Sequence, residues 1–196
     1  GATLAAGKYY QSSMALKDML HTPLTLESMT AGTVVVSSPK SGMKYSLNGA
    51  EKTTDGITSI TVKAGDNVEF FGNGTSITSY DGTTIGGTAQ VKAYGNVMSL
   101  VDETGFAATT TLSADNAFKK LFNVNTGLKD ASALLLPATT LTKDCYYYMF
   151  YGCTSLTTAP ALPATTLAEN CYYWMFYGCT SLTERWALRL ITLLLL

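Results

Sequence analysis

Short runs in which apolar and polar residues alternate dominate the first half of the chain. Four such runs lie between Gly-, Asn- and Ser-rich turns, at 33–36, 43–47, 60–64 and 68–71. Asn48-Gly49, after the second run, is typical of a tight hairpin turn, because both residues tolerate positive φ angles. Strands that recur about every 8 to 12 residues predict an antiparallel sheet or sandwich. We expect residues 1–91 to form this β-rich, sandwich-like region.

The second half carries an internal repeat with a period of 26 residues. Segments 136–157 and 162–183 differ at only four of their 22 aligned positions. A weaker copy lies upstream, with one residue inserted, and its apolar positions are Leu112, Leu121, Phe122 and Leu128. Residues 94–100 also echo residues 151–156, again with one residue inserted. We therefore expect the repeat array to cover residues 92–196.

Each repeat unit is expected to combine an extended segment with a short helix. Residues 143–151 contain neither Gly nor Pro, and Gly152 follows where a helix would end. One or two helical turns there would place Cys145, Met149 and Phe150 on one face. Such a unit cannot bury its inner face alone, so its copies must stack as a solenoid. The predicted repeat core comprises Leu136, Leu141, Cys145, Met149, Phe150, Cys153, Leu156, Leu162, Leu167, Cys171, Met175, Phe176, Cys179 and Leu182.

The spacing of these residues resembles a known repeat. A Leu-Pro pair followed by Cys145, Met149-Phe150, Cys153 and Leu156 is similar to the BspA-type leucine-rich repeats of bacterial cell-surface proteins. Met replaces the usual Ala of that family, Cys145 replaces its usual Ile, and the unit is slightly longer. The Thr-, Tyr- and Cys-rich variant resembles surface proteins of Bacteroides-type bacteria in particular.

This resemblance implies a fold class and a function. The fold would be α+β, β-rich with short helices, in which an antiparallel β domain precedes a short leucine-rich-repeat solenoid. The protein would be secreted or on the cell surface, anchored to the outer membrane in its full-length form, and would act in adhesion to a protein or glycan on a host or neighbouring cell. Residues 5–10 resemble the end of a fimbrillin-like domain, so we interpret residues 1–20 as the end of a preceding domain.

Composition argues against several other classes of function. The net charge is −1 and charged residues make up 14% of the chain, which lacks the basic footprint of a nucleic-acid-binding protein. The single histidine, His21, lies in a polar turn, so a histidine-dependent nucleophilic mechanism is not expected. No window reaches the roughly 18 apolar residues of a membrane span. We predict a protein that is not an enzyme, with no catalytic residue, cofactor or metal site.

Four cysteines invite other interpretations. Cys145, Cys153, Cys171 and Cys179 are too widely spaced within each pair for a zinc knuckle. A disulfide within one repeat would have to span a helix, but pairs in neighbouring coils could approach bonding distance. Inward-packed free thiols are the favoured prediction, and inter-coil disulfides and a metal site are the alternatives. Thiol titration of the unfolded, unreduced protein would separate them.

Aromatic residues are the candidate binding surface. We expect each ring of one copy to form a ladder with its equivalent in the next, and exposed ladders to contact a partner. The alternatives are a carbohydrate-binding module that uses these rings as stacking platforms, and a structural spacer for another domain. The candidate binding residues are Tyr146, Tyr147, Tyr148, Tyr151, Tyr172, Tyr173, Trp174 and Tyr177.

Three features remain. Residues 72–75 contain no phosphate-loop signature, and the sequon at Asn73 is interpreted as turn chemistry. Asp102-Glu103 would supply only half of a glycosidase acid pair and is interpreted as a solvated turn. Segment 186–196 carries eight large apolar residues, and we expect it to pack across the open end of the solenoid or to mediate self-association. An altered gene end is the alternative explanation of that segment.

Overall fold

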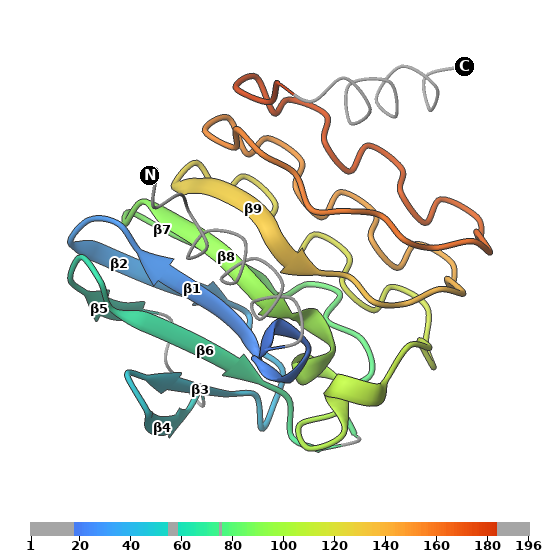
Figure 1. Cartoon of the computed structure of the whole chain (residues 1–196), viewed down its shortest axis with the longest axis horizontal. Helices are drawn as coiled ribbons and strands as arrows, with labels where there is room; N and C mark the ends of the chain where they lie inside the picture. Colours follow the sequence, from blue (N-terminus) through green and yellow to red (C-terminus); the bar gives the residue numbers. More distant parts are fainter. Residues whose placement is uncertain (1–17, 55–58, 75, 184–196) are drawn as a thin grey trace, which may run out of the picture.

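The fold is built mainly from β-strands, with only a few short helical segments. The computed structural model describes residues 18–54, 59–74 and 76–183, and the strands in these ranges form two sheets (Figure 1). A helical turn at 18–21 and the 3-10 helices η1 (Val97–Leu100) and η2 (Phe106–Ala108) are the helical segments of the described ranges. The expectation of a β-rich chain with short helices is therefore confirmed at this level.

The larger sheet, here called sheet A, has six strands. Its order is β4 (Ala50–Thr53), β3 (Lys44–Leu47), β6 (Asn67–Phe71), β1 (Leu24–Ser28), β8 (Val91–Asn96) and β9 (Leu128–Leu135). Neighbours pair antiparallel except β8 and β9, which are parallel. The smaller sheet, sheet B, is antiparallel and runs in the order β5 (Ser59–Val62), β2 (Gly32–Ser37) and β7 (Thr84–Gly87).

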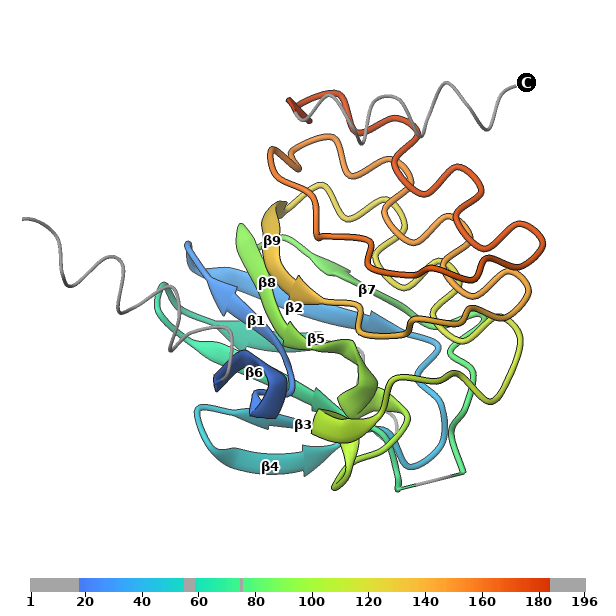
Figure 2. The same cartoon turned by 45° about the vertical axis from the view of Figure 1, so that its right-hand side comes forward.

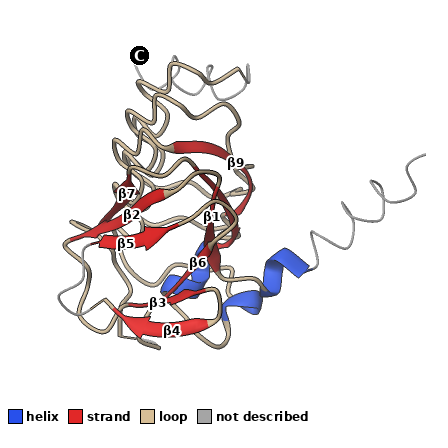
Figure 3. Ribbon diagram, turned by 90° about the vertical axis from the view of Figure 1, so that its left-hand side faces the viewer, coloured by secondary structure: helices blue, strands red, loops and turns tan. Residues whose placement is uncertain are grey.

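Alternation in the sequence determines which side of each strand is buried. Each of the four predicted runs overlaps a strand, β2, β3, β5 or β6, with run 43–47 beginning one residue before β3 and run 60–64 ending two residues after β5. Strand β3 joins β4 through Asn48 and Gly49 at φ 51° and 85°. Inward side chains of the two sheets share one core, including Leu26 and Phe70 from sheet A and Val34 from sheet B. Figure 3 shows the two sheets facing one another.

Three repeat copies stack beyond the sheets (Figure 2). We define copy 1 as residues 111–135, copy 2 as 136–161 and copy 3 as 162–183. Parallel bridges join Thr111 to Thr140 and Thr140 to Thr166. The amide of Phe122 donates to Met149 O (2.9 Å), and that of Phe150 donates to Met175 O (3.0 Å). The weaker upstream copy predicted from the sequence is confirmed in this register.

One predicted correspondence is wrong. The echo of residues 151–156 in 94–100 would place Leu100 at the position of Leu128. In the structure Val91 lies opposite Leu128 instead, because β8 pairs parallel with β9 through residues 91–96. The sequence similarity between residues 94–100 and 151–156 therefore does not predict how β8 is aligned with β9.

The predicted helix at 143–151 is also wrong, because consecutive β-turns occupy this segment. Alternate amides close turns within the copy, as in Tyr147 N–H to Asp144 O (3.2 Å). The amides between them donate to the next copy, as in Tyr146 N–H to Cys171 O (3.0 Å). A helix would use all these amides within one segment and leave the neighbouring copy unpaired. We call residues 116–125, 144–153 and 170–179 the turn ribbons of copies 1, 2 and 3.

Both sheets continue into the stack. Sheet A does so through β8 and β9, and the Ala131 amide of β9 donates to Thr158 O of copy 2 (3.0 Å). Sheet B does so through β7, where Ile85 N–H donates to Leu121 O in the first turn ribbon (2.7 Å). The core is continuous from β1 to copy 3. Copy 1 therefore covers one edge of each sheet, and the predicted division near residue 91 stays a prediction.

Candidate binding surface

The outward positions of the turn ribbons in copies 2 and 3 carry six aromatic rings. Burial along each ribbon follows a period of four, with two residues inward and two outward, and positive φ angles recur at the same period. The outward rings, which we call the aromatic array, are Tyr147, Tyr148, Tyr151, Tyr173, Trp174 and Tyr177.

Ladders between the two copies are confirmed. Tyr147 stacks on Tyr173 with ring centroids 5.3 Å apart, and Tyr148 stacks on Trp174 at 5.5 Å. Tyr151 and Tyr177 follow at 5.6 Å. The ladders form because copies paired in register place equivalent side chains one strand spacing apart, near 4.8 Å.

Rings also contact one another within each copy. Tyr148 lies 4.2 Å from Tyr147 and 4.8 Å from Tyr151, and Trp174 lies 4.7 Å from Tyr177. Ring planes in the array differ by at most 18°, so neighbouring rings cover much of each other's faces. The three rings of copy 2 consequently present mainly their edges and hydroxyls to solvent, and copy 2 covers one side of the copy 3 rings. Tyr177 is the most exposed ring, at 39%, and the other five are half-buried.

Two lysines of copy 1 hold the positions that Tyr147 and Tyr148 hold in copy 2, so they continue these ladders into copy 1. The ammonium of Lys119 lies 5.3 Å from the Tyr147 centroid, and that of Lys120 lies 5.9 Å from the Tyr148 centroid. These distances fit cation–π contacts. Desolvation by its surroundings raises the pKa of Tyr148 to about 12, with a smaller contribution from its hydrogen bond with Tyr147.

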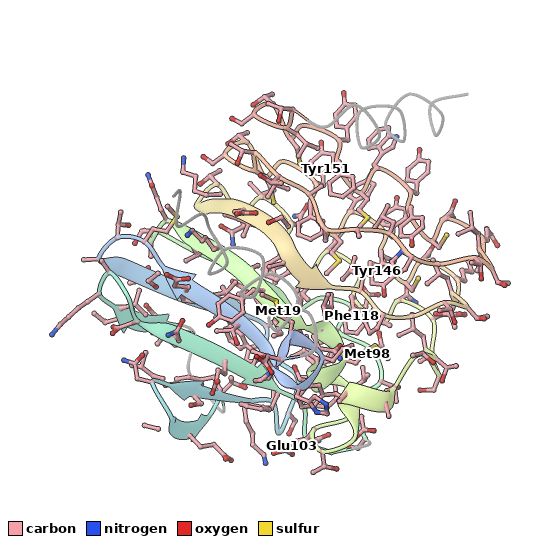
Figure 4. The ribbon with its side chains drawn as sticks, in the orientation of Figure 1. Met19, Met98, Glu103, Phe118, Tyr146 and Tyr151 are labelled. Carbon is pink, nitrogen blue, oxygen red and sulfur yellow. The ribbon has the colours of Figure 1, made fainter. Side chains whose placement is uncertain are left out.

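Two candidate binding residues prove to be core residues. Tyr146 and Tyr172 point inward and are 0% and 7% exposed. They continue a buried ladder from Phe118, with centroids 5.7 Å apart at each step (Figure 4 labels Phe118, Tyr146 and Tyr151). Burial raises the pKa of Tyr146 well above its usual value, and its hydroxyl has no hydrogen-bond partner within the described ranges. Their inward position follows from the period of four, which a helical interpretation of the segment misses.

The repeat-core residues lie mostly where they were expected. Twelve of the 14 are buried, and Leu162 is partly buried against the core. Leu167 is wrong as a core residue, because it is 63% exposed. Its equivalent Leu141 is covered by copy 3, whose Thr166 carbonyl accepts from the Leu141 amide at 2.9 Å. Copy 3 is the last copy that the structure describes, and no described copy covers Leu167 in the same way.

All four cysteines are free and buried. The Cys153 thiol donates to Phe122 O (3.1 Å) and the Cys179 thiol donates to Phe150 O (3.0 Å), so each bonds the preceding copy. Burial raises the pKa of Cys145 to about 12 and that of Cys153 well above its usual value. No group of three or more potential metal ligands occurs among the described residues.

Sequence reasoning missed Asn125, which holds the position of Cys153 and Cys179 in copy 1. Asn125 is 3% exposed, and its amide donates to Ile85 O (3.1 Å). Its side-chain oxygen accepts from the amides of Gly127 and Leu128, both at 3.1 Å. An alignment of all three copies at this column would have identified it, since Asn and Cys can both donate to a carbonyl.

The smaller motifs are structural. Asp102 accepts from the amide of Gly105 (2.8 Å) and the hydroxyl of Thr109 (3.1 Å), which shapes a turn. Glu103 pairs with Lys44 at 2.6 Å. Asn73 accepts from Ser76 and the Ile77 amide, as expected for turn chemistry. Both acidic residues thus take part in local structural contacts.

A pocket of about 260 Å³ lies on the outer face of sheet A, away from the array. Met19, Tyr94 and Ala133 line it, together with the charged residues Glu27, Lys92 and Asp130 (Figure 4 labels Met19). Tyr94 donates to Asn67 Oδ1 (3.1 Å), and desolvation with Glu27 and Glu69 nearby raises its pKa. Lys92 lies between the two carboxylates in the sheet, opposite Glu27 of β1 on one side and opposite Asp130 of β9 on the other.

Comparison of the chain with protein-family models, with curated proteins and with solved structures finds no match. Among the residues that the structure covers, no helix is long and apolar enough to cross a membrane. The expectations for segments 1–17 and 184–196, including the apolar tail, lie outside the described residues.

Proposed function

We propose that this protein is a non-enzymatic, secreted or cell-surface protein that adheres to a protein partner on a host or neighbouring cell. The observation that carries the proposal is the aromatic array, whose six rings contact one another on the outward side of two stacked copies. Tyr and Trp are enriched at the energetic centres of protein interfaces. Outward aromatic rings held rigidly by their neighbours also lose little conformational entropy on binding.

The stack itself is proposed to be a short leucine-rich-repeat solenoid of the BspA-like kind. Leucine-rich repeats in general carry an Asn or Cys at a fixed position, two residues before a Leu, and the spacing in this chain is one residue longer. Here Asn125, Cys153 and Cys179 each donate to a carbonyl of the preceding layer, and each is followed by a buried Leu three positions later. This shared bonding role supports a common repeat unit in all three copies.

Ring geometry favours a protein partner over a carbohydrate. A sugar that stacks on an aromatic platform needs an open ring face. In the array each Tyr of copy 2 has rings or a lysine against it, so a ligand meets the edges and hydroxyls of these three rings. Side chains and backbone groups of a protein can pair with such a surface by apolar contact and hydrogen bonds.

Binding of the labelled full chain to epithelial cell monolayers tests the proposal. Cells are used untreated, after surface proteolysis, and after periodate oxidation of their glycans. We expect binding to be lost after proteolysis and kept after periodate. The double variant Tyr151→Ser/Tyr177→Ser should weaken binding about tenfold or more, since one interface hot spot contributes on the order of 2 kcal/mol.

A matched control is Met29→Ser, which changes an exposed apolar residue between β1 and β2. Met29→Ser should bind as the unchanged chain does, and thermal unfolding should show that both variants remain folded. Sensitivity to periodate alone would replace the proposal with the carbohydrate-binding alternative. An absence of binding under all conditions would favour the structural spacer.

A further inference from the structure

The aromatic array is also a cluster of oxidisable groups. Tyr and Trp are among the side chains that most readily lose one electron, and the array holds five Tyr and one Trp. Neighbouring ring centroids in it are 4.2 to 6.2 Å apart. A radical formed on any ring therefore has other oxidisable rings in direct contact.

Two tyrosine pairs bridge copies 2 and 3. Tyr147 and Tyr173 have centroids 5.3 Å apart and planes 13° apart, and Tyr151 and Tyr177 have 5.6 Å and 14°. Because each pair consists of equivalent residues in register, corresponding ring carbons face one another. Tyr177 is 39% exposed, and Tyr147, Tyr151 and Tyr173 are half-buried, so water reaches part of each of these rings and can accept the phenol proton.

A third tyrosine pair offers an internal contrast. Tyr146 and Tyr172 have nearly the same geometry, with centroids 5.7 Å apart and planes 8° apart. Both are buried, and the Tyr146 hydroxyl has no hydrogen-bond partner among the residues that the structure covers. A phenol that cannot pass its proton to a base or to water is difficult to oxidise, so this pair should stay unreacted.

We propose that the array is an oxidative cross-linking site, at which hydrogen peroxide and a haem peroxidase join copy 2 covalently to copy 3 through Tyr147–Tyr173 or Tyr151–Tyr177. The proposal does not depend on the identity of any binding partner. A bond of this kind would hold the stacked copies together when the surrounding hydrogen bonds open.

The reaction balances with peroxide as the oxidant. Each phenol gives up one electron and one proton, and the two phenoxyl radicals form one carbon–carbon bond ortho to their hydroxyls. The two ring hydrogens move to the oxygens as the rings regain aromaticity. Overall two tyrosines lose two hydrogen atoms, and one hydrogen peroxide is reduced to two waters.

Peptide mapping tests the proposal on the full chain. Dilute protein is treated with hydrogen peroxide and a plant haem peroxidase, the monomer is isolated by gel filtration, and it is cleaved after glutamate. Cleavage after Glu103, Glu169 and Glu184 separates the turn ribbon of copy 2, in peptide 104–169, from the turn ribbon of copy 3, in peptide 170–184. We expect these peptides to be joined, lighter by two hydrogen atoms than their sum, with dityrosine fluorescence.

Conservative variants assign the bond. Tyr173→Phe/Tyr177→Phe keeps the stacked rings but removes the reacting hydroxyls of copy 3, and the joined peptide should disappear. Tyr146→Phe/Tyr172→Phe removes the buried hydroxyls and should leave its yield unchanged. The proposal is overturned if the monomer contains no joined peptide, if coupling occurs only between molecules, or if the first variant still gives the product.

Discussion

Every fourth residue of the turn ribbons has a positive φ angle. The residues at these positions differ in how well they tolerate that conformation. Asn116, Asp144 and Asn170 begin the three ribbons at φ 53–58°, a conformation that Asn and Asp tolerate. Gly152 and Gly178 occupy the last such position in copies 2 and 3. The residue-scale energetics of the stack therefore depend on which side chains are held in a left-handed conformation.

Val124 holds that last position in copy 1, at φ 57°, although β-branched residues are strained there. It is 56% exposed, so its side chain contributes little burial. We expect Val124→Asn to raise stability by about 1 kcal/mol, or roughly 2–4 °C in melting temperature. Urea and thermal unfolding measure this. Val124→Ile keeps the β-branch and should give no gain; equal gains in both variants would contradict a backbone origin.

The thiols should be protected by folding. All four cysteines are buried, and the raised pKa values of Cys145 and Cys153 leave these two with little thiolate near neutral pH. We expect a thiol reagent to label none of them rapidly in the native protein and all four after unfolding without reductant. Fewer than four reactive thiols in the unfolded protein would indicate disulfides instead.

Alkaline pH should destabilise the fold. Burial raises the pKa values of Cys145, Tyr146 and Tyr172, so the folded protein keeps protons that the unfolded chain releases. Their contribution is complete below the unfolded pKa values, about 8.5 for Cys and 10 for Tyr. Stability should fall as the pH rises above this range and through about 12. Urea midpoints measured across the range, with tyrosinate absorbance, check this, and a constant midpoint would contradict it.

At the scale of elements, the turn ribbon is linked to sheet B by a side chain. Asn125→Ala removes one donor to Ile85 O and one acceptor for the amides of Gly127 and Leu128. Leaving these buried groups unpaired should cost about 2–4 kcal/mol. Asn125→Cys introduces the residue that copies 2 and 3 use and should cost less. Chemical denaturation measures both, and equal losses would show that carbonyl bonding at this position is unimportant.

The strands were predictable and the ribbons were not, for a physical reason. In β2, β3, β5 and β6 the apolar residues alternate with a period of two, and Asn48-Gly49 marks a hairpin turn. Together these features are compatible only with antiparallel strands. Along 144–153 a period of four is close to the 3.6 of a helix, so both interpretations place Cys145, Met149 and Phe150 together. They differ at Tyr146, which only the ribbon buries. Hydrogen bonds between neighbouring copies decide between the helix and the turn ribbon. The sequence of a single copy contains no information about these bonds.

For the same reason, part of the candidate site could be predicted. Identity between copies was enough to pair Tyr147 with Tyr173 and Tyr148 with Trp174, because stacked copies in register bring equivalents together. Sequence identity between the copies could not show which rings point outward and that Tyr146 and Tyr172 point inward. Contacts between distant segments, such as Ile85 with Leu121, leave no local signal in the sequence at all.

At the scale of the whole molecule, the two sheets serve as one end of the stack. Terminal repeats need a structure that covers their open face. Here β8 and β7 provide it, one on each side of copy 1, and the core runs through without a break. Copy 1 thus pairs with β8 and β7, and each later copy pairs with the one before.

This continuity predicts a single unfolding transition for the described fold. Trp174 lies in the turn ribbon of copy 3, so its fluorescence, measured in a Trp186→Phe background, follows the far end of the stack. Far-ultraviolet circular dichroism follows mainly the sheets. Leu26→Ala in β1 and Leu156→Ala in copy 2 each remove a fully buried side chain and should cost about 2–5 kcal/mol. If the sheets cap the stack, each variant should lower both midpoints together, because losing the sheets removes the surface on which copy 1 pairs. In the Leu26→Ala variant the fluorescence midpoint could stay unchanged while the circular dichroism midpoint falls. That result would mean that the stack folds on its own, as a separate domain would.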